Sequence, residues 1–584
     1  MATTQTLNRR DFLGKTALGV GGLVFSTVLI GGCRQGPDPG PSDPAQRGTF
    51  GHGVASFDPT DTQVILWTRV SPANAATPKI ALSYELATDA AFRSVVKKET
   101  IDARADDDFT VSIDLGGLTS NTRYYYRFTI AGTDVASVVG ETKTLPRGAE
   151  ASEVKLALTS CSNYPSGLFN VYGAMAASDA DVILHLGDYI YEYGAGQYGS
   201  NPSTGTLNRA PLPATEIISL DDYRTRYRQY RTDAQLQLAH QKKPFICVWD
   251  DHEVANNAWK DGAQNHQPNE GPYAVRKANA LKAYHEYIGV RSEAADKIYR
   301  TFTFGNILNL HMLDTRLVGR DRQLDYATYL NASGQLDTTA FQRDWLSPQR
   351  SLLGAEQLTW LGRALGAGTA AWQVLGQQVL MAKMFLPAEL MLSIAPLLAA
   401  GAGGSGGVDV ATLVRVQAQI NELTALKTRI QNNDPTVTPA ERARITNVLP
   451  YNLDAWDGYP VEREAVYALA RGKRLLTLAG DTHNAWYTDL TANGGTLAGR
   501  EVATPSVTSP GFDGVLSNIP AVLEFFRQAL VTLIDDLNYA NLTQRGYASV
   551  TFTPSRAVAE WRFVDTIATL STAVTVGRSE SIPA

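Results

Sequence analysis

The chain has 584 residues, 44% of them hydrophobic, so it is long enough for more than one domain and can bury at least one large core. This excludes a disordered chain and a small scaffold. Lysine and arginine number 52 against 58 aspartate and glutamate, which gives a formal net charge of -6 and no global basic surface for nucleic acid. The three cysteines, Cys33, Cys161 and Cys247, are too few for a disulfide framework and lack the paired spacing of a zinc ribbon.

The N-terminus, residues 1–33, has the layout of a twin-arginine export signal. Arg9 and Arg10 are followed by an aromatic-aliphatic pair, and no charge occurs between Lys15 and Arg34. The uncharged run contains five glycines, so it is a poor candidate for a permanent membrane span. We therefore expect the twin-arginine machinery to export the chain already folded. Proteins that take this route have often taken up a metal or cofactor beforehand, so a metal centre is a candidate feature of this chain.

The end of this signal resembles a lipobox. Its sequence is Ile-Gly-Gly-Cys at 30–33, in which isoleucine replaces the commoner leucine. The pattern predicts Cys33 as a lipid attachment point and residues 34–48 as a stiff linker rich in glycine and proline. The expected location is the periplasm or the cell surface, with a possible membrane anchor.

Residues 49–145 show short β-rich runs separated by turn residues. This spacing predicts an all-β sandwich of the immunoglobulin or fibronectin type. The expected strands are 64–70, 80–87, 95–101, 109–115, 123–131 and 136–142.

From residue 150 to about 570, apolar runs alternate with helical patterns, which indicates α/β architecture with functional residues in loops at strand ends. The expected buried strands are 155–160, 181–186, 244–249, 308–313, 372–376 and 474–479, and the expected helices include 168–177, 223–240 and 356–365.

Residues of about 385–450 interrupt this alternation, and we interpret them as a lid with a helix over 408–432. Within the lid, Gly-Gly-Ser-Gly-Gly at 403–407 formally matches a serine-hydrolase elbow. We interpret the match as a low-complexity loop, because an elbow needs a strand before it and a helix after it.

Four of the expected strands end in residue types that bind metals. One such residue is weak evidence, because an aspartate at a strand end is more often a turn cap. Together, on strands expected to lie side by side, they are hard to attribute to turns, since converging charges repel unless cations hold them. In chain order they are Cys161; Asp188 with Tyr191 and Glu192; Asp250, Asp251, His252 and Glu253; and Asp481 with His483.

These residues resemble the PhoD-like family of metallophosphatases over nearly the whole chain after the signal. Phe57 departs from the glycine usual at its position, which affects the β domain rather than the site. The matching stretches are 53–59, 64–69, 160–162, 187–193, 249–253, 313–316, 375–378 and 480–483.

The resemblance implies a four-layer αββα catalytic domain behind a fibronectin-like domain, with phosphomonoesterase or phosphodiesterase activity. It also implies a centre of one ferric ion, Fe3+, with calcium, Ca2+, nearby. The residue types agree, since thiolate and phenolate suit ferric iron and grouped carboxylates suit calcium. On the family pattern, Cys161, Asp188, Tyr191 and His483 surround the iron, Asp188 bridges, and Asp251 and Asp481 face calcium.

Several neighbouring residues have supporting roles in this interpretation. Glu192, Asp250 and Glu253 are candidate orienters of the ligands. Asn256 and Asn257 are candidates for calcium-binding carbonyl groups, with helix capping as an equal alternative. Cys247 is a buried strand residue without chemistry of its own.

The implied mechanism follows from charge. A phosphate ester is anionic and the protein is acidic, so positive charge must come from metal ions and a few local cations. A hydroxide held by metal attacks phosphorus, and His252 stabilises or protonates the leaving oxygen. Arg316 is a candidate phosphate clamp, with an ordinary surface ion pair as the alternative. Cys161 as a nucleophile is disfavoured, because no arginine follows five residues later.

Two other functions compete with this interpretation. The first is a phospholipase D of the same family, because the apolar stretch 381–398 offers a lipid contact. The second is a non-catalytic binding protein whose β sandwich is the functional part. The complete set of expected ligands argues against the second.

Overall fold

The computed structural model describes residues 47–402, 410–516 and 520–583. The twin-arginine signal, Cys33, most of the linker and the glycine-rich segment 403–407 lie outside the described residues. The described residues belong to one compact unit, Pro44–Ala584. Among them, no helix is both long and apolar enough to cross a membrane.

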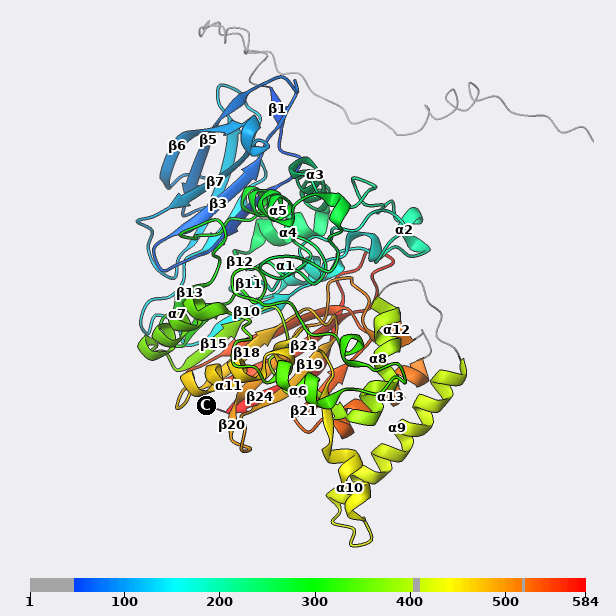
Figure 1. Ribbon diagram of the computed structural model, residues 1–584. Helices are drawn as coiled ribbons and strands as arrows, with labels where there is room; N and C mark the ends of the chain where they lie inside the picture. Colours follow the sequence, from blue (N-terminus) through cyan, green and yellow to red (C-terminus); the bar gives the residue numbers. More distant parts are fainter. Residues whose placement is uncertain (1–46, 403–409, 517–519, 584) are drawn as a thin grey trace, which may run out of the picture. The chain divides into compact units, whose positions relative to one another are not determined.

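The larger of two main sheets has nine strands (Figure 1). Its centre consists of three parallel strands, β10 (Val154–Thr159), β11 (Val182–His185) and β12 (Phe245–Cys247). These are the apolar runs expected to be covered on both faces, and all residues of β11 and β12 are buried. The outer strands are β22 (Gly546–Phe552), β23 (Arg556–Val564) and β24 (Val574–Pro583) beside β10, and β2 (Val54–Phe57), β3 (Val64–Arg69) and β7 (Thr110–Leu115) beside β12.

The second main sheet has seven strands and is also mixed. Its parallel centre places β18 between β15 and β20, again with apolar side chains on both faces. In sheet order the strands are β13 (Arg300–Phe304), β14 (Leu308–Met312), β15 (Trp372–Gly376), β18 (Leu475–Ala479), β20 (Leu497–Ala503), β19 (Ala485–Thr491) and β21 (Leu537–Asn541).

The two sheets share a core, and helices cover their other faces. Leu158 of β10 and Leu476 of β18 belong to the same buried cluster. Leu375 and Leu475 belong to a second buried cluster, which also includes Leu361 of helix α7 (Gly354–Ala367). This is the layered α/β arrangement that the alternation of runs indicated. The helices are α1 (Asn170–Ala177), α2 (Ser203–Thr206), α3 (Leu220–Tyr230), α4 (Ala234–Lys242), α5 (Tyr273–Tyr287), α6 (Thr338–Trp345), α7 (Gly354–Ala367), α11 (Pro460–Leu469), α12 (Phe512–Leu516) and α13 (Pro520–Leu533).

One expected helix, 223–240, is two helices. α3 ends at Tyr230, and α4 begins at Ala234. The break lies at Asp233, whose Oδ1 accepts hydrogen bonds from the backbone N–H groups of Gln235 and Leu236 at 2.9 and 3.1 Å. This cap satisfies amides that a continuous helix would have bonded to its own carbonyl groups.

Apart from the two-stranded sheet of β1 (Gly48–Thr49) and β4 (Ser71–Pro72), the strands of residues 49–145 fall into two groups. One group continues the nine-stranded sheet through β2, which pairs with β12. The other is a separate four-stranded sheet, and a buried cluster that includes Leu66 and Phe128 joins the two groups. In sheet order the four strands are β6 (Val95–Arg104), β5 (Lys79–Ala87), β8 (Arg123–Ile130) and β9 (Gly140–Lys143). An independent β domain with these bounds remains a prediction.

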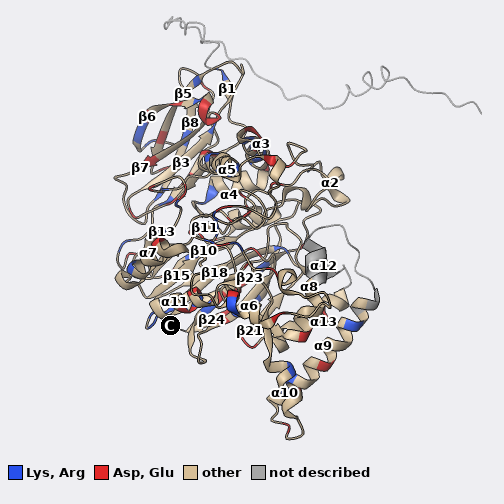
Figure 2. Cartoon of the chain, in the orientation of Figure 1, with Lys and Arg blue, Asp and Glu red and all other residues tan. Residues whose placement is uncertain are grey.

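The segment expected to form a lid is helical and is closed at its base. β16 (Phe385–Pro387) pairs with β17 (Val448–Pro450), so the two ends of the insertion lie together. Between them are α8 (Ala388–Ala402), α9 (Val410–Gln431) and α10 (Pro439–Thr446). Figure 2 shows charges of both signs along α9 and α10, and among them Arg444 forms ion pairs with Glu389 and Glu422.

A buried ion pair anchors β2 to the rest of the chain. Asp58 is fully buried directly after β2. Its carboxylate accepts hydrogen bonds from Arg300 Nε and Nη2 at 2.7 and 2.6 Å and from the backbone N–H of Arg291 at 2.7 Å. Removal of one partner of such a pair leaves an uncompensated buried charge.

We therefore expect Asp58→Asn to lower the free energy of unfolding by about 3 kcal/mol, because Arg300 loses its counter-ion. Urea denaturation followed by fluorescence measures the change. The control is Asp61→Asn, whose partner Arg147 is 62% exposed, with an expected loss below about 0.5 kcal/mol. Equal losses in the two variants would contradict the anchoring role.

Candidate metal centre

The expected ligands come from loops that follow strands of both main sheets. Cys161 follows β10, Asp188 follows β11, and Asp251 follows β12, all in the nine-stranded sheet. Asp481 and His483 follow β18, which belongs to the seven-stranded sheet. The expectation that all four strands lie side by side is therefore wrong for β18. The site forms where the two sheets meet, and an isolated parallel bridge joins Ser160 to Ser506 there.

Four of these residues have left-handed backbone conformations. The φ angles are 63° at Cys161, 56° at Asp188, 65° at Asp481 and 62° at His483. Residues other than glycine rarely adopt this region, although aspartate and histidine do so more often than cysteine. Such conformations persist only where the surrounding structure holds them, and they are typical of functional sites.

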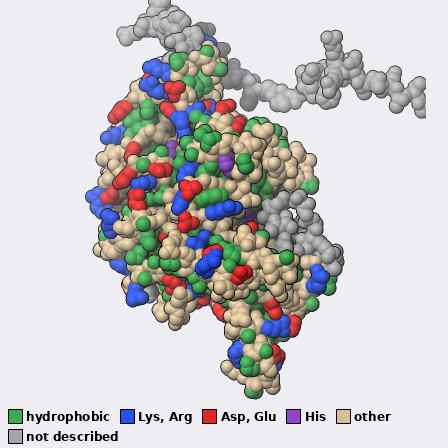
Figure 3. Space-filling model, viewed as in Figure 1, with side chains coloured by type: hydrophobic (Ala, Val, Ile, Leu, Met, Phe, Trp, Pro, Cys, Tyr) green, Lys and Arg blue, Asp and Glu red, His purple; other side chains and the backbone are tan. Residues whose placement is uncertain are grey.

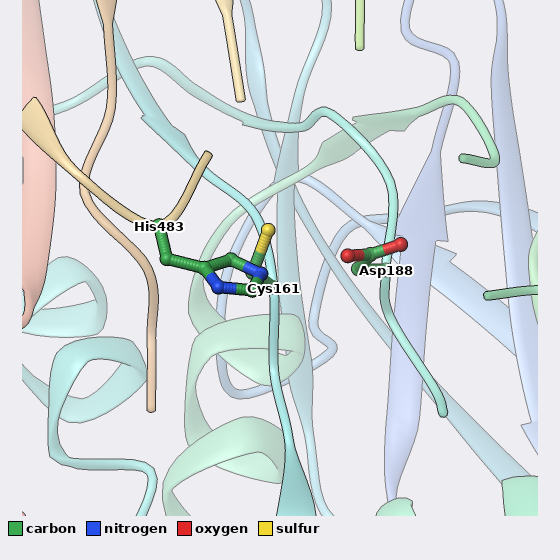
Figure 4. Close-up of side chains that lie close together, drawn as sticks. All are labelled: Cys161, Asp188 and His483. Carbon is green, nitrogen blue, oxygen red and sulfur yellow. The ribbon is translucent and has the colours of Figure 1, made fainter. Parts of the chain in front are cut away.

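The first candidate ligand group combines both sheets. One ligand atom each of Cys161, Asp188 and His483 lies within 4.8 Å of the others (Figure 4). The Tyr191 hydroxyl joins this group, since it donates a 2.9 Å hydrogen bond to Asp188 Oδ2 and lies 3.3 Å from His483 Nε2. The four residues expected to surround iron are thus close together.

Two further groups extend the first towards the acidic side. Asp188, Asp251 and His252 form one, and Asp250, Asp251 and Asp481 form the other, each with ligand atoms within 4.8 Å. Asp188 belongs to the first two groups and Asp251 to the last two. The groups are therefore continuous, as expected for a centre that holds more than one cation.

Burial disfavours the charged forms of the side chains in the first group. Burial, and next to it the charge of Asp188, raises the pKa values of the Cys161 thiol and the Tyr191 phenol. Burial also raises the pKa of Asp188 well above its usual value. It lowers the pKa of His483 to about 4, so the imidazole is neutral and able to bind metal. Without a cation the acidic groups keep protons, and metal binding would release them.

Neighbouring side chains shift the pKa values within the acidic group in different directions. Burial raises the pKa of Asp250 to about 8 and that of Asp481 to about 7, although Arg316 opposes both shifts. At Asp251, burial is outweighed by Arg316 and His252, which lower the pKa to about 2. Asp251 is thus the carboxylate that stays ionised over the widest pH range.

The donor set fits a metal centre. Asp188 Oδ1 is buried and has no hydrogen-bond partner among the described residues. Such an atom costs free energy unless a cation or water satisfies it. Thiolate, phenolate, imidazole and carboxylate oxygen are all metal-binding groups, and side chains that can supply them lie close to Asp188.

His252 is held by a carboxylate. Its Nδ1 lies 2.6 Å from Glu192 Oε2, and both side chains are buried. Burial alone would lower the pKa of His252, but Glu192 and Asp251 raise it well above its usual value. Glu192 Oε1 also accepts hydrogen bonds from Asn265 Nδ2 at 2.8 Å and the backbone N–H of Asn256 at 2.7 Å. The imidazole is therefore fixed in orientation and carries a proton.

Glu253 binds two ligand-bearing loops together. Its carboxylate accepts backbone hydrogen bonds from Asp188 at 3.0 Å, Tyr189 at 2.5 Å and Asp250 at 2.7 Å. The loops also touch directly, because a Cβ on Gly187 would lie only 2.3 Å from Asp250 Cβ. Glu253 and Glu192 thus make the hydrogen bonds that the predicted role as orienters requires.

Arg316 is enclosed by carboxylates. The guanidinium is fully buried, and its nitrogen atoms are bonded to the carboxylates of Asp250, Asp454 and Asp481. Its Nη2 also lies 3.6 Å from Asp251 Oδ1. A group enclosed in this way does not present a free fork to a phosphate, so the structure does not favour the clamp. The alternative of an ordinary surface ion pair does not describe it either, because these ion pairs are buried.

Asn256 and Asn257 lie in turns and cap no helix. Their backbone N–H groups donate to carboxylates instead, Asn256 to Glu192 and Asn257 to Asp251 Oδ2 at 2.5 Å. The helix-capping alternative is therefore wrong for both. Cys247 is buried in β12, as expected.

Three residues of the site were not predicted from the sequence. Ser509 Oγ donates to the Tyr191 hydroxyl at 2.7 Å, and the Tyr198 hydroxyl lies 3.3 Å from His483 Nδ1. Asp454 forms ion pairs with Arg316 and Arg320. None of these residues follows an apolar run directly, so no strand-end pattern singled them out.

Comparisons with known proteins agree with this geometry. A family model for PhoD-like phosphatases matches residues 156–561, and a model for the N-terminal domain of PhoD-like phosphatases matches residues 35–146. Alkaline phosphatase D of Bacillus subtilis (strain 168) is 33% identical over 539 residues, which covers 88% of this chain and 77% of that protein. A solved structure of PhoD is 29% identical with a TM-score of 0.70, covering 91% of this chain and 90% of that one.

A purple acid phosphatase, PPD1 from yellow lupin seeds, shares the fold alone. Its TM-score is 0.50 at 11% identity, over 91% of this chain and 74% of that one. Two mixed sheets with grouped ligands at their strand ends thus define a metallophosphatase-like α/β protein. Because one family model matches more than half of its length, the chain belongs to the PhoD-like phosphatase family.

A substitution can test the hydrogen bonds that three backbone N–H groups donate to Glu253. We expect Glu253→Gln to lower the free energy of unfolding by about 3 kcal/mol, because a side-chain NH2 group then faces backbone N–H groups. Less metal should also remain bound after purification. The control is Asp261→Asn at an exposed position nearby in sequence. Unchanged stability and metal content in Glu253→Gln would contradict the role.

Proposed function

We propose that this chain hydrolyses phosphoric monoesters or diesters as an alkaline phosphatase, with a centre of one ferric ion and calcium. The carrying observation is that the ligand atoms of Cys161, Asp188 and His483 lie within 4.8 Å of one another. Membership of the PhoD-like phosphatase family and the similarity to alkaline phosphatase D support the activity. The proposed iron ligands are Cys161, Asp188, Tyr191 and His483, and Asp251 and Asp481 face calcium.

The kinds of ligand support the choice of metals. Thiolate and phenolate oxygen are strong donors to ferric iron, and the first group contains one of each. The acidic group offers only carboxylate oxygens, which suit a hard cation such as calcium. Bound there, the cations would supply positive charge to the phosphoryl oxygens and lower the pKa of a water molecule.

The chain's own residues would handle the leaving group. Glu192 holds His252 through Nδ1, so Nε2 is the ring nitrogen left to donate a proton. The raised pKa of His252 keeps that proton bound at neutral pH, as a general acid requires. The face of the molecule drawn in Figure 3 mixes positive and negative side chains, and the whole chain has a net charge of -6. The attraction of an anionic ester therefore falls to the site itself.

The buried state of the apolar stretch argues against the phospholipase rival. Met381, Leu390 and Ile394 are at most 3% exposed and belong to the second core cluster. Their side chains therefore pack within the protein and do not offer a surface to lipid. This supports soluble phosphate esters as the preferred substrates.

Export is part of the proposal. The twin-arginine pattern and the lipobox-like Ile-Gly-Gly-Cys at 30–33 support transport of the folded protein to the periplasm or cell surface. A lipid on Cys33 would then anchor it to a membrane. Insertion of iron before transport is consistent with this route.

The activity has a direct test. We expect p-nitrophenyl phosphate or its bis-ester to be hydrolysed faster than phosphatidylcholine, because Met381, Leu390 and Ile394 of the apolar stretch are buried in the protein core. Elemental analysis of freshly purified protein should find iron and calcium. A faster rate on phosphatidylcholine would overturn the substrate proposal, and the absence of both metals would overturn the centre.

The matched variant for the same assay is Cys161→Ser, which keeps the size of the side chain and loses the thiolate. We expect the rate to fall by about a hundredfold or more, together with the iron content and any charge-transfer colour. Cys247→Ser is the control, because Cys247 is buried in a strand and belongs to no ligand group. Full iron and activity in Cys161→Ser would refute the ligand role.

Anchoring has its own test. We expect Cys33→Ser to move the protein from the membrane fraction to the soluble fraction, because the acylated side chain is lost. Immunoblots of fractionated cells measure the change. If both proteins fractionate alike, the lipid attachment is contradicted.

A further inference from the structure

Arg316 is the cation around which the acidic half of the site is arranged. The side chain is 0% exposed, and it enters from the loop after β14. Its Nη2 donates to Asp481 Oδ1 at 2.9 Å, and its Nε donates to Asp250 Oδ1. Two carboxylates of the candidate calcium group therefore share their charge with a guanidinium.

The opposite edge of the same guanidinium is held by Asp454. Arg316 Nη1 donates to Asp454 Oδ2 at 2.6 Å. Asp454 also pairs with Arg320, whose Nη2 donates to the backbone carbonyl of Asp454 at 2.6 Å. Asp454 follows β17, the closing strand of the helical insertion. The segment that leaves the insertion directly after β17 thus supplies the carboxylate that fixes how Arg316 faces the site.

The charges in this network do not balance. Four carboxylates, those of Asp250, Asp251, Asp454 and Asp481, meet the two guanidinium groups of Arg316 and Arg320. With all four ionised, the two guanidinium groups leave two negative charges in a buried place, which protons, the His252 imidazolium beside Asp251 and a cation can offset. A divalent cation supplies the missing charge, and a fixed guanidinium beside it weakens its binding.

We propose that Asp454 is a positioning residue which, through Arg316, sets how strongly the carboxylates of Asp250, Asp251 and Asp481 hold a cation. Asp454 neutralises part of the positive charge of Arg316, and it accepts the hydrogen bond from one edge of the guanidinium group. Without it, Arg316 bonds more fully to the three carboxylates and competes with the cation for their oxygens. The inference rests on the proposed function, because it deepens the role of the acidic group.

Two variants at opposite ends of the contact should act in opposite directions. We expect Asp454→Asn to weaken calcium binding by about tenfold, because Arg316 is then neutralised only by the site carboxylates. We expect Arg316→Gln to tighten calcium binding several-fold and to lower the melting temperature in chelator, because the carboxylates lose their internal cation. A purely structural role would weaken binding in both.

The experiment titrates calcium chloride into chelator-treated full-length protein by isothermal calorimetry, with melting temperatures recorded with and without calcium. The control is Asp434→Asn, which removes an ion pair with Arg429 elsewhere in the same insertion and should leave the calcium affinity unchanged. Calcium affinity that is unchanged or higher in Asp454→Asn would overturn the proposal. If Arg316→Gln fails to fold, Asp454→Asn alone decides.

Hydrolysis of p-nitrophenyl phosphate by the unmodified protein separates this inference from the proposed function. If the unmodified protein is active and Asp454→Asn binds calcium with the same affinity as the unmodified protein, the inference is overturned and the proposed function stands. Absence of both activity and calcium binding in the unmodified protein would overturn the proposed function, and the inference with it.

Discussion

The burial of several acidic groups at the meeting of two sheets is the constraint on which the site depends. Asp188 is at its centre, because it belongs to two ligand groups and its Oδ1 has no partner among the described residues. Carboxylates at such a place repel one another unless positive charge is supplied. The chain supplies part of it through Arg316 and His252, and metal ions would supply the rest.

The surrounding structure holds these groups at close range against their repulsion. Left-handed backbone at Cys161 and His483 turns each chain sharply at the end of its strand. Glu253 binds two loops through backbone amides, and Gly187 lets those loops approach each other. The loops and their hydrogen bonds thus hold the candidate ligands in place, as partners beyond the ligands do in metal sites.

Local patterns in the sequence were sufficient for most strands and for the grouping of the candidate ligands. Apolar runs followed by Cys161, Asp188 and Asp481 led directly to residues that the structure brings together. The sequence could not show which strands belong to which sheet, because β18 has the same apolar pattern as β11 although it lies in the other sheet. The enclosure of Arg316 was not predicted for a related reason: its partner Asp454 lies 138 positions away, and nothing local to either residue indicates the pair.

X-ray diffraction with anomalous scattering at the iron edge tests the central claim most directly. Crystals of protein purified without chelator should show an iron peak within bonding distance of Cys161 Sγ and an oxygen of Asp188, with a lighter ion on the carboxylate side. A site without an anomalous peak in active protein, or a peak bonded to neither residue, would contradict the account.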